Sequence, residues 1–430
     1  MNMKSTFFIK LYKWLHDNED EIKDDLPKNY FLLLLSSTFT KLGDTLSNPK
    51  TVLTWVMTIM NAPVYLISLI VPIRESGSML PQIVLGNYVK TKEKRKRIYI
   101  FGALLQCVAI FAMGLTAYNF EGVLGGFIIV FFLIIFSLSR SLCSLSSKDV
   151  LGKVIPKQSR GKLKGYTSSV SGVLVLIAGL FLIYKSKEDT TILFYSLLLI
   201  FASSMWLLAA LFYSSIKEPK SEVEKTRISL KNSFHKLTLL KNNKHFRNFI
   251  IARSLLLCSS LSAPFYVLLA QRNIGKDAYL LGLFILVNGI ASVISAPIWG
   301  KMADKSSKNV MSIASLVASF LGILMVVILV IFKEISSLYW IYPVAFFILG
   351  IAHSGVRLGR KTYIVDMAEG NKRTDFVAIS NTIIGLILLI TGGLSALASI
   401  FSVEAVLLLL SLFGVFGAYR SYQLPNVEEN

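Results

Sequence analysis

Five ionisable residues lie deep inside long apolar segments of the chain: Lys41, Asp44, Arg74, Glu75 and Arg140. A charged side chain costs about 3 kcal/mol or more at the centre of a lipid bilayer, so such residues face a protein interior or a water-filled cavity. There they can bind a solute or pair with one another, and the carboxylates can also take up and release a proton. These five residues are therefore the candidates for solute binding and coupling.

The first four candidates form two close pairs. Lys41 and Asp44 share one helix face at a spacing of three, so they can pair with each other. At a rise of 1.5 Å per residue, they and the pair Arg74–Glu75 lie about 15–22 Å from the end of their segments, near mid-membrane. Because the two segments run antiparallel, the pairs can meet. Either these charges couple or bind, or they form closed salt bridges that only hold the helices together.

The balance of charge at this depth bears on the solute. Lys41, Arg74 and Arg140 outnumber Asp44 and Glu75. A cavity with surplus positive charge favours an anionic or zwitterionic solute. For Arg140, as for the two pairs, a structural role stays open beside a binding role.

The apolar segments that carry these residues are long enough to cross a membrane, which takes about 20 residues. Hydrophobic residues make up 54% of the 430 residues. Apolar runs and helix breakers divide the chain into twelve candidate spans. They are 30–58, 63–89, 98–118, 122–147, 165–184, 190–215, 246–271, 278–299, 309–332, 338–361, 375–397 and 401–419.

The basic residues predict the orientation of these spans. The net charge is +20, but the Lys and Arg residues are scattered between the spans, which does not suggest a nucleic-acid partner. They gather in the loops at 90–97, 153–164 and 217–245, whereas the loops around Asn61, Tyr118 and Ser399 have none. By the positive-inside rule, both termini are cytoplasmic. Arg253, Arg357 and Lys361 are then expected near the cytoplasmic surface, with their side chains extended toward water.

The long polar stretch at 217–245 separates two groups of six spans. We therefore predict a cytoplasmic amphipathic segment at 1–29, a first six-helix bundle at 30–216, a linker at 217–245, a second bundle at 246–419 and a cytoplasmic tail at 420–430. A shift of about 213 positions places Lys361 on Lys148 and Gly385 on Gly172, which suggests an internal repeat.

One loop motif resembles a known family. The segment Gly300-Lys301-Met302-Ala303-Asp304-Lys305 is similar to the signature of the major facilitator superfamily: a glycine, three variable residues, an aspartate and a basic residue. The equivalent loop of the first half begins at Gly86 but has Lys90 where the family has its aspartate. Arg140 lies in a setting similar to the family's fourth-helix arginine motif.

The resemblance implies an all-α membrane protein with twelve transmembrane helices in two six-helix bundles related by a pseudo-two-fold axis. It also implies a secondary transporter that works by alternating access, with Gly86, Gly300, Asp304 and Lys305 as gating residues that latch the bundles on the cytoplasmic side.

We therefore expect a monomer in the inner (plasma) membrane that moves a small organic solute, with the proton as coupling ion and membrane lipid as its surroundings. No catalytic triad, metal-ligand spacing or nucleotide loop is visible, so we expect no enzyme, cofactor or metal. An alternative is a protein of the same fold that handles lipid or assists membrane assembly without moving a solute. The amphipathic start and the basic loops would suit contact with anionic lipid.

Overall fold

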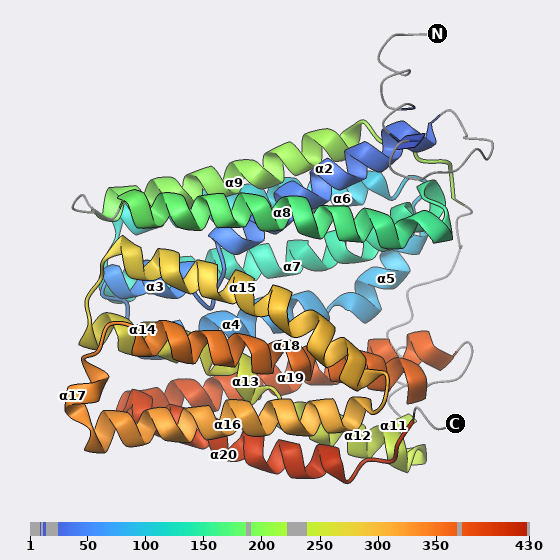
Figure 1. Ribbon diagram of the computed structural model, residues 1–430. Helices are drawn as coiled ribbons and strands as arrows, with labels where there is room; N and C mark the ends of the chain where they lie inside the picture. The colour runs from blue at the N-terminus through green and yellow to red at the C-terminus, as the bar shows by residue number, and fades with distance from the viewer. Residues whose placement is uncertain are drawn as a thin grey trace.

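The computed structural model describes residues 9, 12–13, 25–185, 191–221, 239–367 and 372–427, and within these ranges it contains helices and no strand. The helices run side by side in two groups, which are the upper and lower parts of Figure 1. The predicted all-α class is confirmed. Most of the predicted segment at 1–29 and of the linker at 217–245 lies outside the described residues, so the predicted domain boundaries stay a prediction.

The first half of the molecule makes six passes. They are α2 (Leu26–Leu46) continued by α3 (Val52–Ile59), α4 (Val64–Met79) continued by α5 (Gln82–Lys90), α6 (Lys96–Asn119), α7 (Gly122–Val154), α8 (Lys157–Lys185) and α9 (Ile192–Ser214).

The second half makes six more. They are the run of α12 (Lys244–Leu255), α13 (Cys258–Leu261) and α14 (Ala263–Asn273), then α15 (Ala278–Ala303), α16 (Ser307–Ile331), α18 (Ile341–Met367), α19 (Lys372–Phe401) and α20 (Val403–Tyr422). The short helices α11 (Leu239–Asn242) and α17 (Lys333–Ser336) precede α12 and α18.

Ten of these passes are long and apolar enough to cross a membrane by length and composition. The other two are the passes that break into α2 with α3 and α4 with α5. Together they give the twelve predicted spans.

The break between α2 and α3 has a local cause. Pro49 has no backbone N–H to continue the helix, and the chain resumes a helical course only at Val52. Two hydroxyl groups satisfy the carbonyls at the break: Ser47 donates to the carbonyl of Gly43 at 3.0 Å, and Thr54 donates to that of Pro49 at 2.7 Å. An irregular backbone at this depth is tolerated because it is buried inside the protein.

The most extensive contacts between the two halves are those of α4 with α19, α8 with α15, and α3 with α14. Close approach along the first pair needs a residue without a side chain, since a Cβ on Gly392 would lie 2.4 Å from Cγ of Pro72. The largest apolar core includes residues of both halves, among them Trp55, Trp206 and Tyr266.

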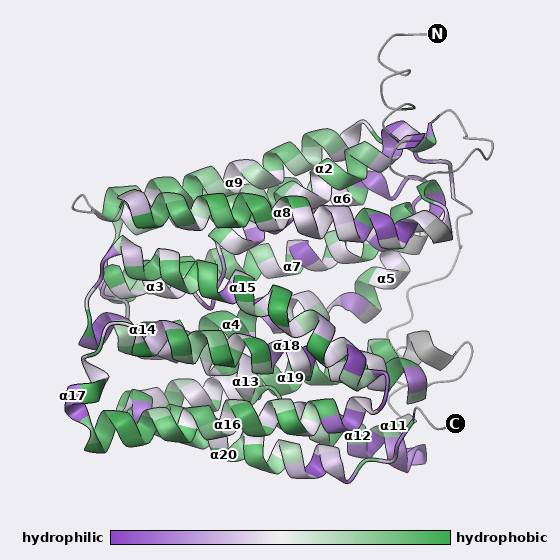
Figure 2. Ribbon diagram, in the orientation of Figure 1, coloured by the Kyte–Doolittle hydropathy of each residue, from purple (hydrophilic) through white to green (hydrophobic). Residues whose placement is uncertain are grey.

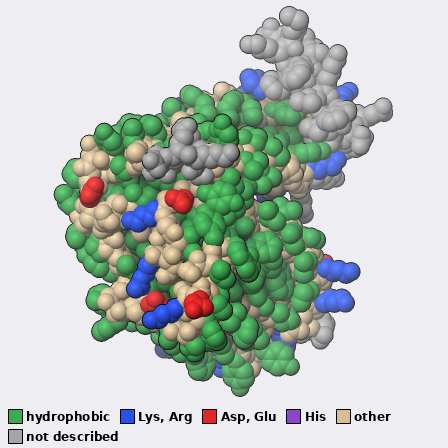
Figure 3. Space-filling model, turned by 60° about the vertical axis from the view of Figure 1, so that its left-hand side comes forward, with side chains coloured by type: hydrophobic (Ala, Val, Ile, Leu, Met, Phe, Trp, Pro, Cys, Tyr) green, Lys and Arg blue, Asp and Glu red, His purple; other side chains and the backbone are tan. Residues whose placement is uncertain are grey.

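Helix α2 begins and α20 ends at the same end of the molecule, on the right of Figure 1. The basic loops at 90–97 and 153–164 lie there as well, and we call this end the basic end. Figure 2 shows hydrophilic residues concentrated at the basic end and hydrophobic residues along the length of the helices. Figure 3 shows a broad hydrophobic surface on the side of the molecule, with the charged side chains gathered toward its two ends. This distribution is the one that a multi-pass membrane protein requires.

A buried carboxylate connects the ends of α6, α7 and α9 at the basic end. The fully buried side chain of Glu218 accepts hydrogen bonds from the backbone N–H groups of Arg95 and Lys96, at 3.1 and 2.8 Å, which start α6. It also pairs with Lys153, near the end of α7, at 3.0 Å. Asp149 pairs with Arg95 and Lys153 beside it. Glu218 therefore fixes the chain just after α9 to the ends of α6 and α7.

We predict that Glu218→Gln lowers the midpoint of thermal unfolding in detergent. Hydrogen bonds to a charged group contribute about 1.5–3 kcal/mol each; the neutral amide would weaken the bonds from the two backbone N–H groups and would leave Lys153 with Asp149 as its remaining counter-ion. Glu93→Gln is the matched control: the exposed Glu93 lies 3.6 Å from exposed Lys220, and such surface pairs contribute about 0–1 kcal/mol. Equal midpoints for the two variants would contradict the role of Glu218.

Candidate functional site

Asp44 forms an ion cluster with two arginines in the middle of the first half. Its Oδ1 accepts from Nη2 of Arg74 on α4 at 2.8 Å and from Nη1 of Arg140 on α7. The Arg74 guanidinium also lies over the ring of Phe136, with its carbon 5.3 Å from the ring centroid. One carboxylate thus neutralises only one of two guanidinium charges. Arg140 keeps 34% of its side chain exposed, so it can reach a solute.

Lys41 does not join this cluster, so the pair with Asp44 that the spacing allows does not form. Its ammonium donates to Oγ of Ser168 on α8 at 2.7 Å. The reason is that two guanidiniums from α4 and α7 already occupy the Asp44 carboxylate. Lys41 is left as an exposed cation that faces α8 at mid-depth.

Glu75 follows Arg74 on α4 but is placed differently from Asp44. It is half-buried, and among the described residues its carboxylate has no ion-pair partner within 4.0 Å. The charges that act on it from farther away are those of Lys50, Arg74, Arg140 and Arg360. Glu75 is thus a carboxylate surrounded by cations without being closed into a salt bridge.

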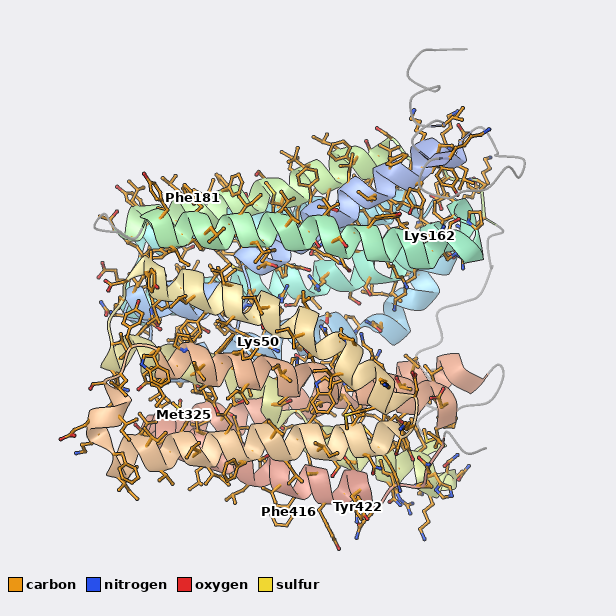
Figure 4. The ribbon with its side chains drawn as sticks, viewed as in Figure 1. Lys50, Lys162, Phe181, Met325, Phe416 and Tyr422 are labelled. Atoms are coloured by element: carbon orange, nitrogen blue, oxygen red, sulfur yellow. The ribbon has the colours of Figure 1, made fainter. Side chains whose placement is uncertain are left out.

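Lys50 connects the two halves. It lies in the break between α2 and α3, in the middle of the molecule (Figure 4), and its ammonium is 3.1 Å from Nε2 of His353 on α18. Because an ammonium can only donate, Nε2 accepts. The other ring nitrogen, Nδ1, then carries the hydrogen and lies 3.4 Å from Oγ of Ser259 on α13. The break in the helix thus turns Lys50 toward the second half.

The second half contributes more cations. Arg253 on α12 is only 5% exposed and donates to Oγ of Ser380 and to Oδ1 of Asn381, at 3.0 Å for the latter. The expectation that Arg253 reaches the surface is therefore wrong. Asn381 in turn donates to Oε1 of Gln82 on α5 at 3.4 Å, which is another contact between the halves.

Helix α18 carries three cations between His353 and the basic end, namely Arg357, Arg360 and Lys361. Positions 353, 357, 360 and 361 follow one helix face at spacings of three and four, which is the sequence signal for a cationic face. The sequence analysis singled out Arg357 and Lys361 but not Arg360, whose charge acts on Lys50, His353 and Arg253.

The end opposite the basic end is closed between the halves. Gln271 on α14 donates to the carbonyl of Trp55 on α3 at 3.3 Å. Lys276 donates to the carbonyl of Thr58 at 3.4 Å, and its own carbonyl accepts from Tyr195 on α9 at 3.4 Å. These contacts join both halves across the central axis at that end.

Helices α8 and α15 approach each other closely near the closed end. A Cβ on Gly179 would lie 2.8 Å from Cδ2 of Leu286, and one on Gly282 would lie 3.0 Å from the carbonyl of Gly179. Seven residues nearer the basic end, on the same faces, Gly172 and Gly289 have no such neighbour within 4 Å. The halves therefore separate along α8 and α15 toward the basic end. Along α4 and α19 they stay close, since a Cβ on Gly385 would lie 2.9 Å from Cγ of Leu80.

The predicted gating residues lie at the basic end. Asp304 follows α15, and it and Lys305 are exposed. Among the residues that the structure describes, Asp304 has no ion-pair partner, and neither Gly86 nor Gly300 has a neighbour within 4 Å of a Cβ built on it. The gating role of this loop stays a prediction. No group of three or more His, Cys, Asp or Glu that could hold a metal ion occurs within the described ranges.

The separation of α8 and α15 predicts a difference in thiol accessibility. In a background whose free cysteines Cys107, Cys143 and Cys258 are replaced by serine, Gly172→Cys should react with a membrane-impermeant thiol reagent added at the basic end. Gly179→Cys is the matched control on the same face and should react at least about tenfold more slowly, because α15 covers it. Equal labelling rates would contradict the open arrangement.

Comparison with known proteins agrees with this architecture. The family model of the Major Facilitator Superfamily matches residues 33–341 and 255–428. No curated protein is significantly similar to the chain in sequence. Among solved structures, the chain is similar to a D-xylose–proton symporter, with a TM-score of 0.71 and 13% identity over 93% of this chain and 99% of that one.

Two other solved structures are similar to the same extent. The nucleoside transporter NupG has a TM-score of 0.66 and 12% identity over 92% of this chain and 98% of its own. The inward-open xylose transporter XylE from E. coli has a TM-score of 0.68 and 12% identity over 92% of this chain and 97% of its own. At these identities the likeness shows the fold alone. The family match and the two groups of six passes lead to one conclusion: the chain belongs to the major facilitator superfamily.

Proposed function

We propose that this protein is a secondary transporter that moves a small organic anion across the inner (plasma) membrane by alternating access, with the proton as coupling ion. Membership of a transporter family makes it a multi-pass transporter rather than an enzyme. One observation carries the choice of an anion: a single carboxylate, Asp44, lies between Arg74 and Arg140, while Lys41 stands beside them without a carboxylate partner among the described residues.

The surplus charge is the physical reason for an anionic solute. Desolvated cations attract anions more strongly than cations in water do, because the local dielectric constant is lower. Arg140 is the residue with both a partly exposed guanidinium and a position at mid-depth, so we assign it to the solute. A planar guanidinium binds carboxylate and phosphate groups through two parallel hydrogen bonds. Lys41 would add a second positive charge from α2.

The two carboxylates have different roles in this proposal. Asp44 holds Arg74 and Arg140 in place and stays ionised, because protonation would leave two guanidiniums together without a counter-ion. Glu75 is free of a direct ion pair within the described part of the chain and lies among four cations. Binding of a solute anion changes the field at Glu75, which links occupation of the site to uptake or release of a proton. One protein of similar fold is a D-xylose–proton symporter, which supports proton coupling in this fold.

The proposed orientation places the basic end in the cytoplasm, as the positive-inside rule requires. In that orientation the structure is closed to the outside by Trp55, Gln271 and Lys276 and separated toward the cytoplasm along α8 and α15. Asp304 has no ion-pair partner among the described residues. In this proposal it joins the two bundles only when their cytoplasmic ends come together. This conformation is the one from which an imported solute leaves or an exported one enters.

The test compares transport in proteoliposomes by the wild-type protein and by variants of each of the two carboxylates. With an imposed pH gradient, we expect the wild-type protein to accumulate at least one member of a panel of radiolabelled organic anions. Glu75→Gln should abolish accumulation against a gradient but keep anion exchange, because glutamine cannot carry the proton. Asp44→Asn should abolish both, since Arg74 and Arg140 would lose their shared counter-ion.

Glu404→Gln is the matched control, because Glu404 is a carboxylate at the far end of the molecule, 3.6 Å from Arg272. It should transport as the wild type does. Wild-type accumulation by Glu75→Gln would contradict the coupling role. Accumulation of neutral solutes and of no anion by the wild-type protein would contradict the proposed function itself.

A further inference from the structure

The second half carries a cluster of cations that the proposed binding of one anion by Arg140 leaves unused. Arg253 lies nine positions after the start of α12, and Arg357 lies ten positions before the end of α18. Both are therefore about 14–15 Å from the basic end of their helices. They lie between that end and the mid-membrane contact of Lys50 with His353. Two different helices thus bring these cations to a similar depth.

The cations of this cluster lie close enough to act on one another. The charge of Arg360 acts on Arg253, on Lys361 and on Lys50. The charge of Arg357 acts on Arg360 and on Lys50 as well. The cluster therefore spans α12, α18 and the break between α2 and α3, and it faces the first half.

Carboxylates are scarce around this cluster. Among the described residues, Glu75 is the carboxylate that acts on Arg360 and on Lys50. Asp366 has a partner of its own and lies one residue before the end of α18, about 9 Å beyond Arg360. Among the described groups whose charges act on one another here, cations outnumber the carboxylates Asp44 and Glu75 eight to two. The cations are Lys50, Arg74, Arg140, Lys148, Arg253, Arg357, Arg360 and Lys361.

Buried donors in the cluster lack acceptors. Arg253 is 5% exposed, and its Nε has no hydrogen-bond partner; the Nε of Arg360 lacks one as well. Arg357 is exposed on the face of α18 that carries His353, and no hydrogen bond of its side chain occurs among the described residues. A buried donor without an acceptor costs about 1–3 kcal/mol, and more when it is charged. An anion bound here would remove that cost.

We propose that Arg253, Arg357 and Arg360 of the second half form, with Lys50 of the first, a subsite for a dianion, so that the transported solute is a phosphate monoester or a dicarboxylate. This inference rests on the proposed function, which requires only an anion. The shared chemistry is a dianion: arginines bind both phosphate and carboxylate oxygens in bidentate geometry. Contacts from both halves to one solute also couple its binding to the relative position of the halves.

The test measures the thermal stability of the purified protein with anions that carry either two negative charges or one. The dianions are succinate and inorganic phosphate at pH 8, and the monoanions are butyrate and chloride, all at constant ionic strength. We expect saturable stabilisation by at least one dianion at a half-saturating concentration about tenfold lower than that of the monoanions, the effect of one further charge-assisted contact. Succinate and phosphate are tested separately. Stabilisation by succinate indicates a dicarboxylate as the solute, and stabilisation by phosphate indicates a phosphate monoester.

Two variants test whether the preference for dianions arises from this cluster. Arg357→Gln, whose side chain makes no hydrogen bond among the described residues, should raise the midpoint of the unliganded protein by relieving repulsion and should remove the preference for dianions. Arg420→Gln is the matched control, since Arg420 is a partly exposed cation near the end of α20 that contacts only Gln423, at 3.4 Å, among described side chains. It should keep the wild-type preference.

The outcomes separate this inference from the proposed function. Monoanions that stabilise the wild-type protein as tightly as dianions, or a dianion preference that survives in Arg357→Gln, would overturn the dianion subsite and leave an anion transporter. No saturable stabilisation by any of the four anions would overturn both.

Discussion

The structure depends on one constraint, which is that every charge at membrane depth needs compensation from within the protein. Asp44 meets it for the first half, because its single carboxylate binds guanidiniums from α4 and α7 and so joins three of the six passes at mid-depth. Removing the carboxylate would leave two cations together in a medium where each costs several kcal/mol. The same contact leaves one positive charge in excess, and the proposed attraction for an anion follows from that excess.

Breaks in two helices bring side chains of both halves together at mid-depth. The pass that carries Asp44 stops being helical at Ser47, and the non-helical residues before Val52 bring Lys50 to His353 of the opposite half. The seventh pass breaks in the same way around Cys258, which places Ser259 against the other nitrogen of His353. Corresponding passes of the two halves are thus interrupted at the same depth. Interrupted helices at mid-membrane are a recurrent feature of transporter binding sites.

Much of this fold follows from the sequence, because the bilayer restricts it to helices of a known length. The twelve passes and the clustering of basic residues at one end could be predicted from apolar runs and loop charges. Side-chain partners could not. The spacing of three between Lys41 and Asp44 indicates a shared helix face, but Arg74 and Arg140 reach Asp44 from other helices. Likewise, the position of Arg253 suggested the surface, whereas Ser380 and Asn381 of α19 hold it inside. Such partners are set by helix packing, which a single sequence does not reveal.

The most direct test of the central claim, an anion bound between the two halves, is the current of proteoliposomes on a solid-supported membrane during a jump in solute concentration. The account predicts a saturable transient current with organic anions at constant ionic strength and none with D-xylose or a nucleoside. A saturable current with D-xylose or a nucleoside, and none with any organic anion, would contradict it.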